Sequence, residues 1–261
     1  MGLKNQVVLV TGSTTGIGEA IAHRVAAEGA RVMVHGTRED AAGEVTEAIR
    51  AKGGVASYVV APLEEAASAA LIVERVIAEW GRIDVIVNNA ATVPRANLET
   101  TSVELFDRII AVNLRAPFLL TQAALPHFRK QGGGRVLNLG SINAYCGEKN
   151  LCVYSASKGA LTTLTRNLAD GYGAEGIRVN MLSPGWVLTK NEYETQRREG
   201  MPEDWPERLP KTLTPGGRLL KPEEIAAAAM YLLSDEAALV NGTVMEIEQY
   251  PMIGRNPPKE I

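Results

Sequence analysis

The sequence predicts an α/β fold: a Rossmann-like, doubly wound sheet of seven mostly parallel strands, with helices on both faces. Three observations favour this fold. Apolar, β-branched runs alternate with helical patterns along the 261 residues, as in successive βαβ units. The runs are continuous, which is typical of parallel strands buried on both faces. No linker or internal repeat interrupts them, so we expect residues 1–261 to form a single domain.

Composition and charge exclude several classes of protein. The chain is 46% hydrophobic and 22% charged, and its net charge of -3 gives no general attraction to nucleic acid or to an anionic membrane. The first residues lead straight into a strand without a signal peptide, and no apolar run is expected to be long enough to span a bilayer. Cys146 and Cys152 suggest no disulfide framework. These features predict a cytoplasmic protein with free cysteines and no nucleic-acid or membrane partner.

In the first half of the chain, four strands alternate with three helices. We expect the strands at 7–10, 31–35, 56–60 and 83–87, and the helices at 20–27, 41–51 and 68–80. The third helix has apolar residues at helical spacing, and Gly29 follows the first helix as a stop signal. Residues 101–104, Thr-Ser-Val-Glu, have capping-box spacing and open a long helix that runs to about residue 131.

The second half continues the same alternation. A fifth strand at 136–139 leads to Ser141, and the next helix runs to about Tyr172. A sixth strand at 178–182 precedes a stretch of weak periodicity, residues 190–217, whose length within a compact fold indicates a functional loop or lid. Pro222 and the acids after it open a last helix, and residues 244–248 form the seventh strand.

A glycine-rich turn joins the first strand to the first helix. Residues 11–18 read Thr-Gly-Ser-Thr-Thr-Gly-Ile-Gly, and this context of strand, turn and helix is that of a dinucleotide site. Glycines let the backbone approach a pyrophosphate, and the helix N-terminus offers free N–H groups. The spacing is wider than in the usual Rossmann turn, and a purely structural turn is the alternative. No Gly-Lys-Ser/Thr follows, which excludes a Walker loop.

The end of the second strand bears on the choice of cofactor. An acidic residue there would bind the ribose hydroxyls and favour NAD. None occurs from His35 to Arg38; instead, Thr37 and Arg38 offer a hydroxyl and a guanidinium, which suit a 2′-phosphate. We therefore expect NADP(H). NAD(H) is the alternative if Arg38 is only a solvated residue at the start of a helix.

Ser141, Tyr154 and Lys158 could meet at one carbonyl oxygen. On a helix, Tyr154 and Lys158 stand four residues apart and share a face. A free tyrosine titrates near ~10, and a neighbouring ammonium would favour the phenolate and lower that pKa. Ser141 follows a strand that would deliver its hydroxyl to the edge of the sheet. An ordinary amphipathic helix with a surface tyrosine and lysine is the alternative.

The topology would bring these separate motifs together. The residues that close or follow predicted strands are Gly12, Arg38, Asn88, Ser141 and Pro184. Parallel strands all end at the same edge of a sheet, and ligands of doubly wound sheets bind outside that edge. We therefore expect these residues to gather on one rim.

In combination, these motifs resemble the short-chain dehydrogenase/reductase family, and the match covers nearly the whole chain. The family's motifs appear in order, each on the expected element: the glycine turn 11–18, Asn88-Asn89-Ala90, Asn113, Ser141, Tyr154 with Lys158, and Pro184-Gly185 with Thr189. The resemblance, which includes 3-oxoacyl-acyl-carrier-protein reductase-like members, implies hydride transfer between NAD(P)(H) and a ketone or secondary alcohol. It also implies a homotetramer and no metal site.

The resemblance assigns roles to individual residues. Tyr154 would be the general acid and base, Lys158 would lower its pKa and bind the nicotinamide ribose, and Ser141 would orient the substrate oxygen. Asn113 would hold a water that links Lys158 to solvent. The cofactor would lie against Gly12, Thr14, Thr15, Gly16, Ile17, Gly18, Thr37, Arg38, Leu63, Asn89, Ala90, Tyr154, Lys158, Pro184, Gly185, Val187 and Thr189. The substrate side, beneath a lid at about 190–217, would include Asn143, Tyr145, Glu148 and Trp186.

The sequence departs from the family pattern at four places. Around Pro62 the usual acid is replaced, which leaves Leu63 to make backbone contacts only, and Ala91 stands where glycine is common. Residues 246–250, which end in Tyr250, replace a frequent Asp-Gly-Gly. Glu175 stands where members that dock acyl carrier protein tend to be basic, which weakens the 3-oxoacyl reductase interpretation.

Three functions therefore compete. The first is an NADP(H)-dependent oxidoreductase that acts on a small ketone or secondary alcohol. The second is a sugar or polyol dehydrogenase that uses NAD(H). The third is a dinucleotide-binding sensor or scaffold without turnover, which would be expected to lose Tyr154, Lys158 or Ser141. The sequence keeps all three residues and so favours an enzyme.

Overall fold

Seven parallel strands form the centre of the protein. The computed structural model describes residues 2–249, so Tyr250 and the rest of 250–261 lie outside the described residues. The strands are β1 (Val7–Val10), β2 (Arg31–Gly36), β3 (Val55–Val60), β4 (Val85–Asn88), β5 (Gly134–Leu139), β6 (Ile177–Pro184) and β7 (Val244–Ile247). Their order is β3-β2-β1-β4-β5-β6-β7, and every neighbouring pair is parallel. The order reverses between β1 and β4, which confirms the predicted doubly wound sheet.

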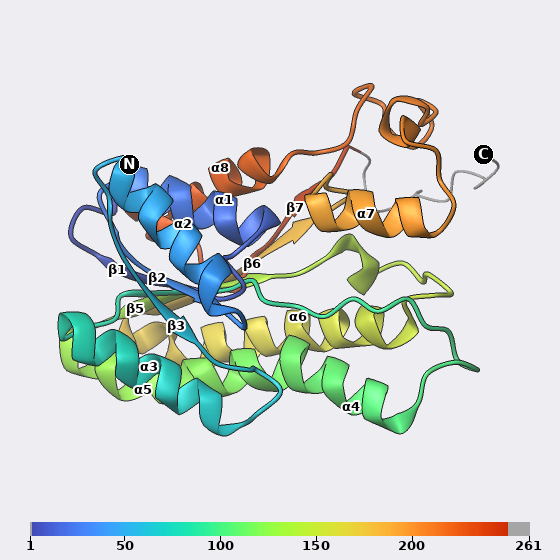
Figure 1. The fold of residues 1–261 in the computed structure, drawn as a ribbon. Coiled ribbons are helices and arrows are strands. Elements are labelled where there is room, and N and C mark those ends of the chain that lie inside the picture. Colours follow the sequence, from blue (N-terminus) through green and yellow to red (C-terminus); the bar gives the residue numbers. More distant parts are fainter. Residues whose placement is uncertain (1, 250–261) are drawn as a thin grey trace.

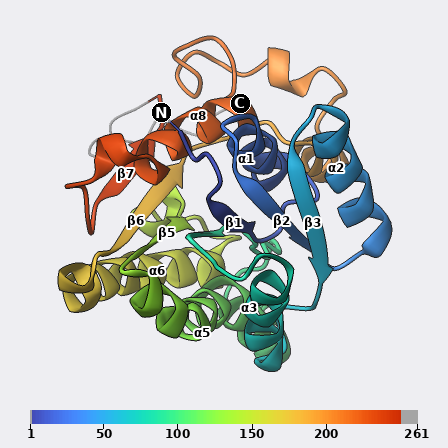
Figure 2. The ribbon, with the colours of Figure 1, turned by 90° about the vertical axis from the view of Figure 1, so that its left-hand side faces the viewer.

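Helices cover both faces of the sheet, as Figures 1 and 2 show. One face carries α1 (Gly16–Ala27), α2 (Glu39–Ala51) and α8 (Pro222–Leu233), and the other carries α3 (Ala67–Trp80), α5 (Ala116–Gln131) and α6 (Cys152–Tyr172). In β1, Val8 and Val10 pack into the first layer, and Val7 and Leu9 into the second. This two-sided burial is the physical reason for the continuous apolar runs in the strands.

Helix starts differ from the predicted ones where polar or glycine residues hide the helical pattern. α1 begins at Gly16 rather than at residue 20, because the last part of the glycine turn already forms its first turn. α2 begins at Glu39, and its first turn contains Glu39 and Asp40. Carboxylates are favourable there because they face the positive end of the helix dipole.

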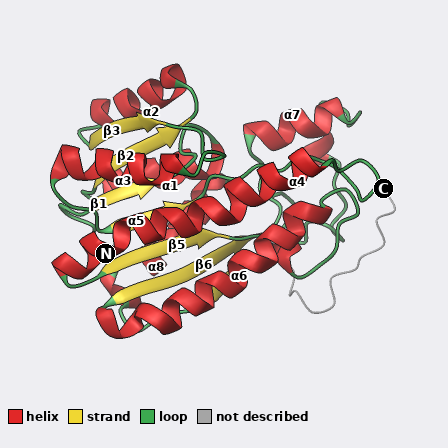
Figure 3. Cartoon of the chain, turned by 90° about the horizontal axis from the view of Figure 1, so that it is seen from below, coloured by secondary structure: helices red, strands yellow, loops and turns green. Residues whose placement is uncertain are grey.

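The predicted long helix over residues 101–131 is one continuous structure with a change of winding in its middle. α4 (Val103–Ile110) is capped by Ser102, whose hydroxyl accepts from the Leu105 N–H. A π-helical turn, Ala111–Arg115, then joins α4 to α5 (Figure 3). Such turns are rare and occur frequently at functional sites.

The helix Val103–Gln131 also corrects one expectation from the sequence. Among the described residues it is long and apolar enough to cross a membrane by length and composition, with a mean hydropathy of 1.3. Half of that apolar stretch is buried inside the protein, where Leu120 and Ala124 pack into the second core layer. A core helix of a globular fold has these same properties.

The stretch 190–217, predicted as irregular, contains a helix. α7 (Lys190–Arg198) begins at Thr189, whose hydroxyl accepts from the Glu192 N–H. No residue of α7 is buried within the described structure, so its sequence has no apolar stripe to reveal it. α7 stands beyond the end of β6, beside the carboxyl edge of the sheet (Figure 1).

Candidate active site

The glycine turn after β1 has the shape of a phosphate cradle. Gly12 and Gly16 both have a φ of 60°, which favours glycine. A Cβ on Gly12 would lie 2.8 Å from the Cα of Ala90, and one on Gly18 would lie 2.3 Å from the Gly12 carbonyl oxygen. Within the described structure Thr15, the N-cap of α1, makes no side-chain cap hydrogen bond. The first N–H groups of α1 are therefore available to an anion.

Asn89 and Ala90 hold this turn against the end of β4. The Asn89 side-chain amide donates to the carbonyl oxygens of Thr11 (2.9 Å) and Gly12 (3.0 Å). In return, the Thr11 hydroxyl accepts from the N–H groups of Asn89 (3.0 Å) and Ala90 (3.1 Å). The predicted cofactor residues Asn89 and Ala90 thus also build the turn itself, and the sequence placed Thr11 in the turn motif without revealing these hydrogen bonds.

His35 ties the glycine turn to β2 and β3. The Gly12 N–H donates to Nδ1 of His35 (3.2 Å), and Nε2–H donates to the Ala61 carbonyl oxygen (3.0 Å). This pattern requires a neutral imidazole, and burial lowers the pKa of His35 to about 4. The structural role of His35 could not be predicted from the sequence, because it depends on two backbone groups that are distant in the chain. The sequence showed only that the residue is not acidic.

The ends of β2 and β3 have room for a charged group. Thr37 and Arg38 are exposed, and the nearest ion-pair contact of Arg38 is Asp40 at 3.8 Å. Thr14 packs beside Gly36, where a Cβ would lie 2.5 Å from the threonine methyl. The side chain of Leu63 is buried, so only its backbone can face a ligand. The exposed guanidinium is the kind of donor that pairs with phosphate oxygens.

Ser141, Tyr154 and Lys158 come together as predicted. Ser141 follows β5 and its side chain hydrogen-bonds Tyr154. Nζ of Lys158 lies 5.7 Å from the centre of the Tyr154 ring and donates to the Leu139 carbonyl oxygen at 2.6 Å. Three groups from β5 and α6 therefore converge at the carboxyl edge of the sheet, beside the glycine turn.

The electrostatics of this group differ from the expectation. Burial raises the pKa of Tyr154, the hydrogen bond from Ser141 lowers it, and the charge of Glu192 raises it again. Burial lowers the pKa of Lys158 to about 8. The predicted lowering of the Tyr154 pKa by Lys158 is therefore not observed, because desolvation of the phenolate is the larger effect.

Asn113 lies in the π-helical turn and is buried. Its Oδ1 accepts from the Thr92 N–H (2.9 Å), and its Nδ2 donates to the Thr92 carbonyl oxygen (3.1 Å) and to the Ser157 hydroxyl (3.1 Å). Ser157 in turn donates to the Tyr154 carbonyl oxygen (2.7 Å). The side chain of Asn113 therefore holds α6 and the segment after β4 together, and the predicted water remains a prediction.

The cofactor residues predicted after β6 line the same rim. Pro184 closes β6, and the Gly185 N–H donates to the Ile247 carbonyl oxygen at 2.8 Å. Val187 is buried in the core layer beside α1, to which Ile17 also contributes. Thr189 lies beside Gly16, because a Cβ on that glycine would be 3.2 Å from the threonine methyl. The residue just before the segment predicted as a lid and the glycine turn are thus close together.

The predicted substrate residues lie on two segments. Asn143, Tyr145 and Glu148 follow Ser141, and Tyr145 is 47% exposed. Burial and the charge of Glu246 raise the pKa of Tyr145. Trp186 follows β6 and stacks on Trp205 of the segment 190–217, with 5.6 Å between ring centres. Sequence reasoning missed Trp205 and Glu192, since nothing in the spacing of the lid indicates what they contact.

No metal centre and no disulfide occur among residues 2–249. No group of three or more His, Cys, Asp or Glu side chains there could hold an ion. Cys146 and Cys152 are both free, as predicted, and the Cys146 thiol donates to the Ile142 carbonyl oxygen. Cys152 is exposed at the start of α6.

Comparisons with known proteins show which proteins the chain resembles. A family model described as Enoyl-(Acyl carrier protein) reductase matches residues 12–249. An uncharacterized oxidoreductase of Thermotoga maritima is 40% identical over 95% of this chain and 98% of its own. D-threitol dehydrogenase of Mycolicibacterium smegmatis is 34% identical over 94% and 92%. A crystal structure of a 3-oxoacyl (acyl-carrier-protein) reductase from Agrobacterium tumefaciens with NADP bound has a TM-score of 0.87 and 33% identity, with 94% of each chain covered.

Proposed function

The chain belongs to the short-chain dehydrogenase/reductase family, and from this premise we propose that it transfers a hydride between NADP(H) and a ketone or secondary alcohol. NADP(H), when bound, supplies or accepts the hydride. Gly12, Gly16 and the N-terminus of α1 would hold its pyrophosphate. The remaining cofactor contacts are those predicted on the same rim, from Thr14 to Thr189. The whole chain would act as one domain with α7 in its lid.

The protein's own residues would handle the proton. Tyr154 would give its phenolic proton to the substrate oxygen in reduction and remove it in oxidation. Ser141, hydrogen-bonded to Tyr154, would orient that oxygen and stabilise its developing charge. Lys158, held by the Leu139 carbonyl oxygen, would favour the phenolate once a bound cofactor and substrate complete the site.

The main support for this proposal is that Ser141, Tyr154 and Lys158 lie close together. Removal of the phenolic oxygen of Tyr154 tests it. Tyr154→Phe should lower turnover by about 10²–10⁴-fold, since the general acid is lost, while NADPH binding stays intact. Tyr231→Phe, on the exposed side of α8, is the matched control and should keep full activity. A panel of ketones and alcohols with both cofactors supplies the assay. Full turnover by Tyr154→Phe would refute the mechanism, and a wild-type protein that binds NADPH without turnover would favour a sensor or scaffold.

Cofactor choice rests on Thr37 and Arg38. Both are exposed at the end of β2, where a 2′-phosphate could pair with the guanidinium. Arg38→Asp should weaken binding of NADP(H) far more than that of NAD(H), and fluorescence titration with the two cofactors measures the ratio. A wild-type protein that already prefers NAD(H) contradicts this assignment.

A small-molecule substrate is favoured over one carried by acyl carrier protein. Glu175 forms a two-pronged ion pair with Arg129, at 2.6 and 2.9 Å, and Arg129 also lies over the Tyr172 ring. The charge of this arginine is thus matched within the chain rather than offered to an acidic partner. Among small substrates, a sugar or polyol is the second candidate, and the polar lid favours it.

A cytoplasmic homotetramer completes the proposal. α4 and α5 expose several large apolar side chains, namely Val103 (72%), Phe106 (47%) and Phe118 (41%). Burial of such side chains is a driving force for subunit association. Light scattering of the purified protein should give four times the mass of one chain, and a mass of 28.0 kDa would refute the tetramer.

A further inference from the structure

Glu192 is the centre of a polar cluster at the base of the lid. Its Oε1 accepts from Trp186 Nε1 (2.9 Å) and from Gln196 Nε2 (2.9 Å). The same oxygen lies 3.5 Å from Nη2 of Arg95, in the segment that follows β4. One carboxylate oxygen thus joins the segment after β4, the segment after β6 and α7.

Arg95 is held by a second carboxylate from the far end of the same helix. Its Nε lies 2.8 Å from Oε1 of Glu199, and its side chain is 28% exposed. The cluster therefore contains one guanidinium and two carboxylates, with an excess of negative charge. An anionic substrate would meet an arginine that is already paired and a carboxylate that repels it.

The negative charge of Glu192 reaches the reacting group. It is one of the charges that raise the pKa of Tyr154, together with burial. The cluster also lies beside the reacting group at the edge of the sheet, because Trp186 follows β6 and β6 pairs with β5, whose end leads to Ser141. A substrate whose oxygen lies at Tyr154 would extend its remaining atoms toward Trp186 and Glu192.

The hydrogen bonds of Glu192 leave it able to accept another. Among the described residues, those made by its side chain all end on Oε1, so Oε2 can accept from a ligand hydroxyl. The indole N–H of Trp186 is used by Glu192, and the ring itself stacks on Trp205. Trp186 thus offers a substrate only apolar ring surface, which suits the C–H groups of a hydroxylated carbon chain.

We propose that Glu192 determines specificity: it accepts a hydroxyl of an uncharged polyhydroxylated substrate and excludes the corresponding carboxylic acid. The assignment rests on the proposed function, because it takes the substrate oxygen to lie at Tyr154. It names the substrate class as polyols and their ketoses, and it separates these from aldonates.

The test compares threitol with threonate, which have the same four carbons and differ in one carboxylate. Binding of each to the NADP⁺ complex is measured by calorimetry for the wild type, Glu192→Gln and Glu194→Gln. Glutamine keeps the size of the side chain and an acceptor for Trp186 but loses the charge. Glu194, exposed on α7, is the matched control.

Wild type and Glu194→Gln should bind threitol more tightly than threonate. In Glu192→Gln the ratio of the two affinities should fall by at least about tenfold, which corresponds to the loss of one charged hydrogen bond. In turnover assays, Glu192→Gln should also move the rising limb of the pH profile to lower pH, because a charge that raises the Tyr154 pKa is gone. A merely structural role would leave that limb in place. Equal discrimination by wild type and Glu192→Gln, or no binding of either probe to wild type, overturns the assignment. Failure of the proposed function is distinct: no alcohol or ketone would then give Tyr154-dependent turnover.

Discussion

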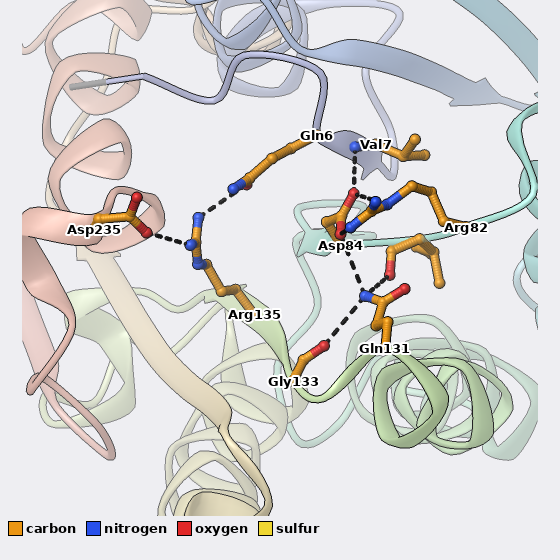
Figure 4. A network of polar contacts seen from close by, with 9 residues as sticks. Gln6, Val7, Arg82, Asp84, Gln131, Gly133, Arg135 and Asp235 are labelled. Atoms are coloured by element: carbon orange, nitrogen blue, oxygen red, sulfur yellow. Dashed lines mark hydrogen bonds and ion pairs between the residues drawn. The ribbon is translucent and has the colours of Figure 1, made fainter.

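The two edges of the sheet use buried polar groups in opposite ways. At the amino edge, Asp84 accepts from the Val7 N–H (2.8 Å), from Arg82 and from Gln131 (Figure 4). Gln131 also donates to the Ile83 and Gly133 carbonyl oxygens. At the carboxyl edge, Lys158 is buried with a carbonyl as partner.

This difference separates stability from function. The polar groups at the amino edge form hydrogen bonds with one another, so their burial costs little free energy. These hydrogen bonds fix the starts of β1 and β4. At the carboxyl edge, burial shifts the pKa of both Lys158 and His35 downward. Such shifts mean that the fold bears a cost to hold these groups in place, as functional sites commonly do.

Removal of the Lys158 charge should give the largest effect, because this buried group belongs to the functional edge of the sheet. Lys158→Met should lower kcat/KM by about 10²-fold or more, because a charge aimed at the reacting oxygen is lost. Its folded-state pKa of about 8 lies below the ordinary 10.5, so the cost of burying the charge is full below pH 8 and disappears by pH 10.5. The wild type should therefore gain roughly 3 kcal/mol relative to the variant between pH 7 and 10.5, as measured by urea unfolding. If the difference in unfolding free energy between wild type and Lys158→Met does not vary with pH, the predicted cost of burying the Lys158 charge is wrong.

His35 should give an effect of similar or slightly smaller size in acid. Its folded-state pKa of about 4 lies below the ordinary 6.5, so the stability it provides is present above pH 6.5 and is lost as the pH falls toward 4. The loss should be roughly 3 kcal/mol in wild type and absent in His35→Gln. His127→Gln, on α5, is the control and should behave as wild type does. Thermal unfolding from pH 7 to 4 measures all three.

Replacement of Asp84, at the amino edge, should give the smallest of the three effects. Asp84→Ala leaves the buried Val7 N–H without its acceptor and should cost about 2 kcal/mol of unfolding free energy. Since the active site lies at the other edge, kcat/KM should be unchanged. Asp235→Ala is the matched control, because the Asp235 side chain is 80% exposed and an ion pair of such a carboxylate is worth about 1 kcal/mol or less. A fall in kcat/KM for Asp84→Ala would show that the two edges are coupled.

Much of the fold was predictable because buried strands have a continuous apolar pattern. The strand alternation, the rim and the group of Ser141, Tyr154 and Lys158 were all confirmed as arrangements. α7 was missed because no residue in it is buried in the described structure. The π-helical turn around Asn113 was missed because its sequence differs in no visible way from the helices beside it.

What could not be predicted is the set of partners across the chain. His35 meets backbone groups of Gly12 and Ala61, and Glu192 meets Arg95 nearly a hundred residues earlier. These pairings depend on packing and have no spacing rule. The direction of the Tyr154 pKa shift was wrong for the same reason, because the degree of burial is a tertiary property.

The π-helical turn Ala111–Arg115 makes this region sensitive to chain length. It closes hydrogen bonds one residue further along the chain than an α-helical turn does. Loss of a single residue there would convert the wide turn into an ordinary α-helical turn. Asn113 lies in that turn and would lose the backbone position from which it bonds Thr92. The length of this turn therefore bears on the active site, because Asn113 is joined to the Tyr154 backbone through Ser157.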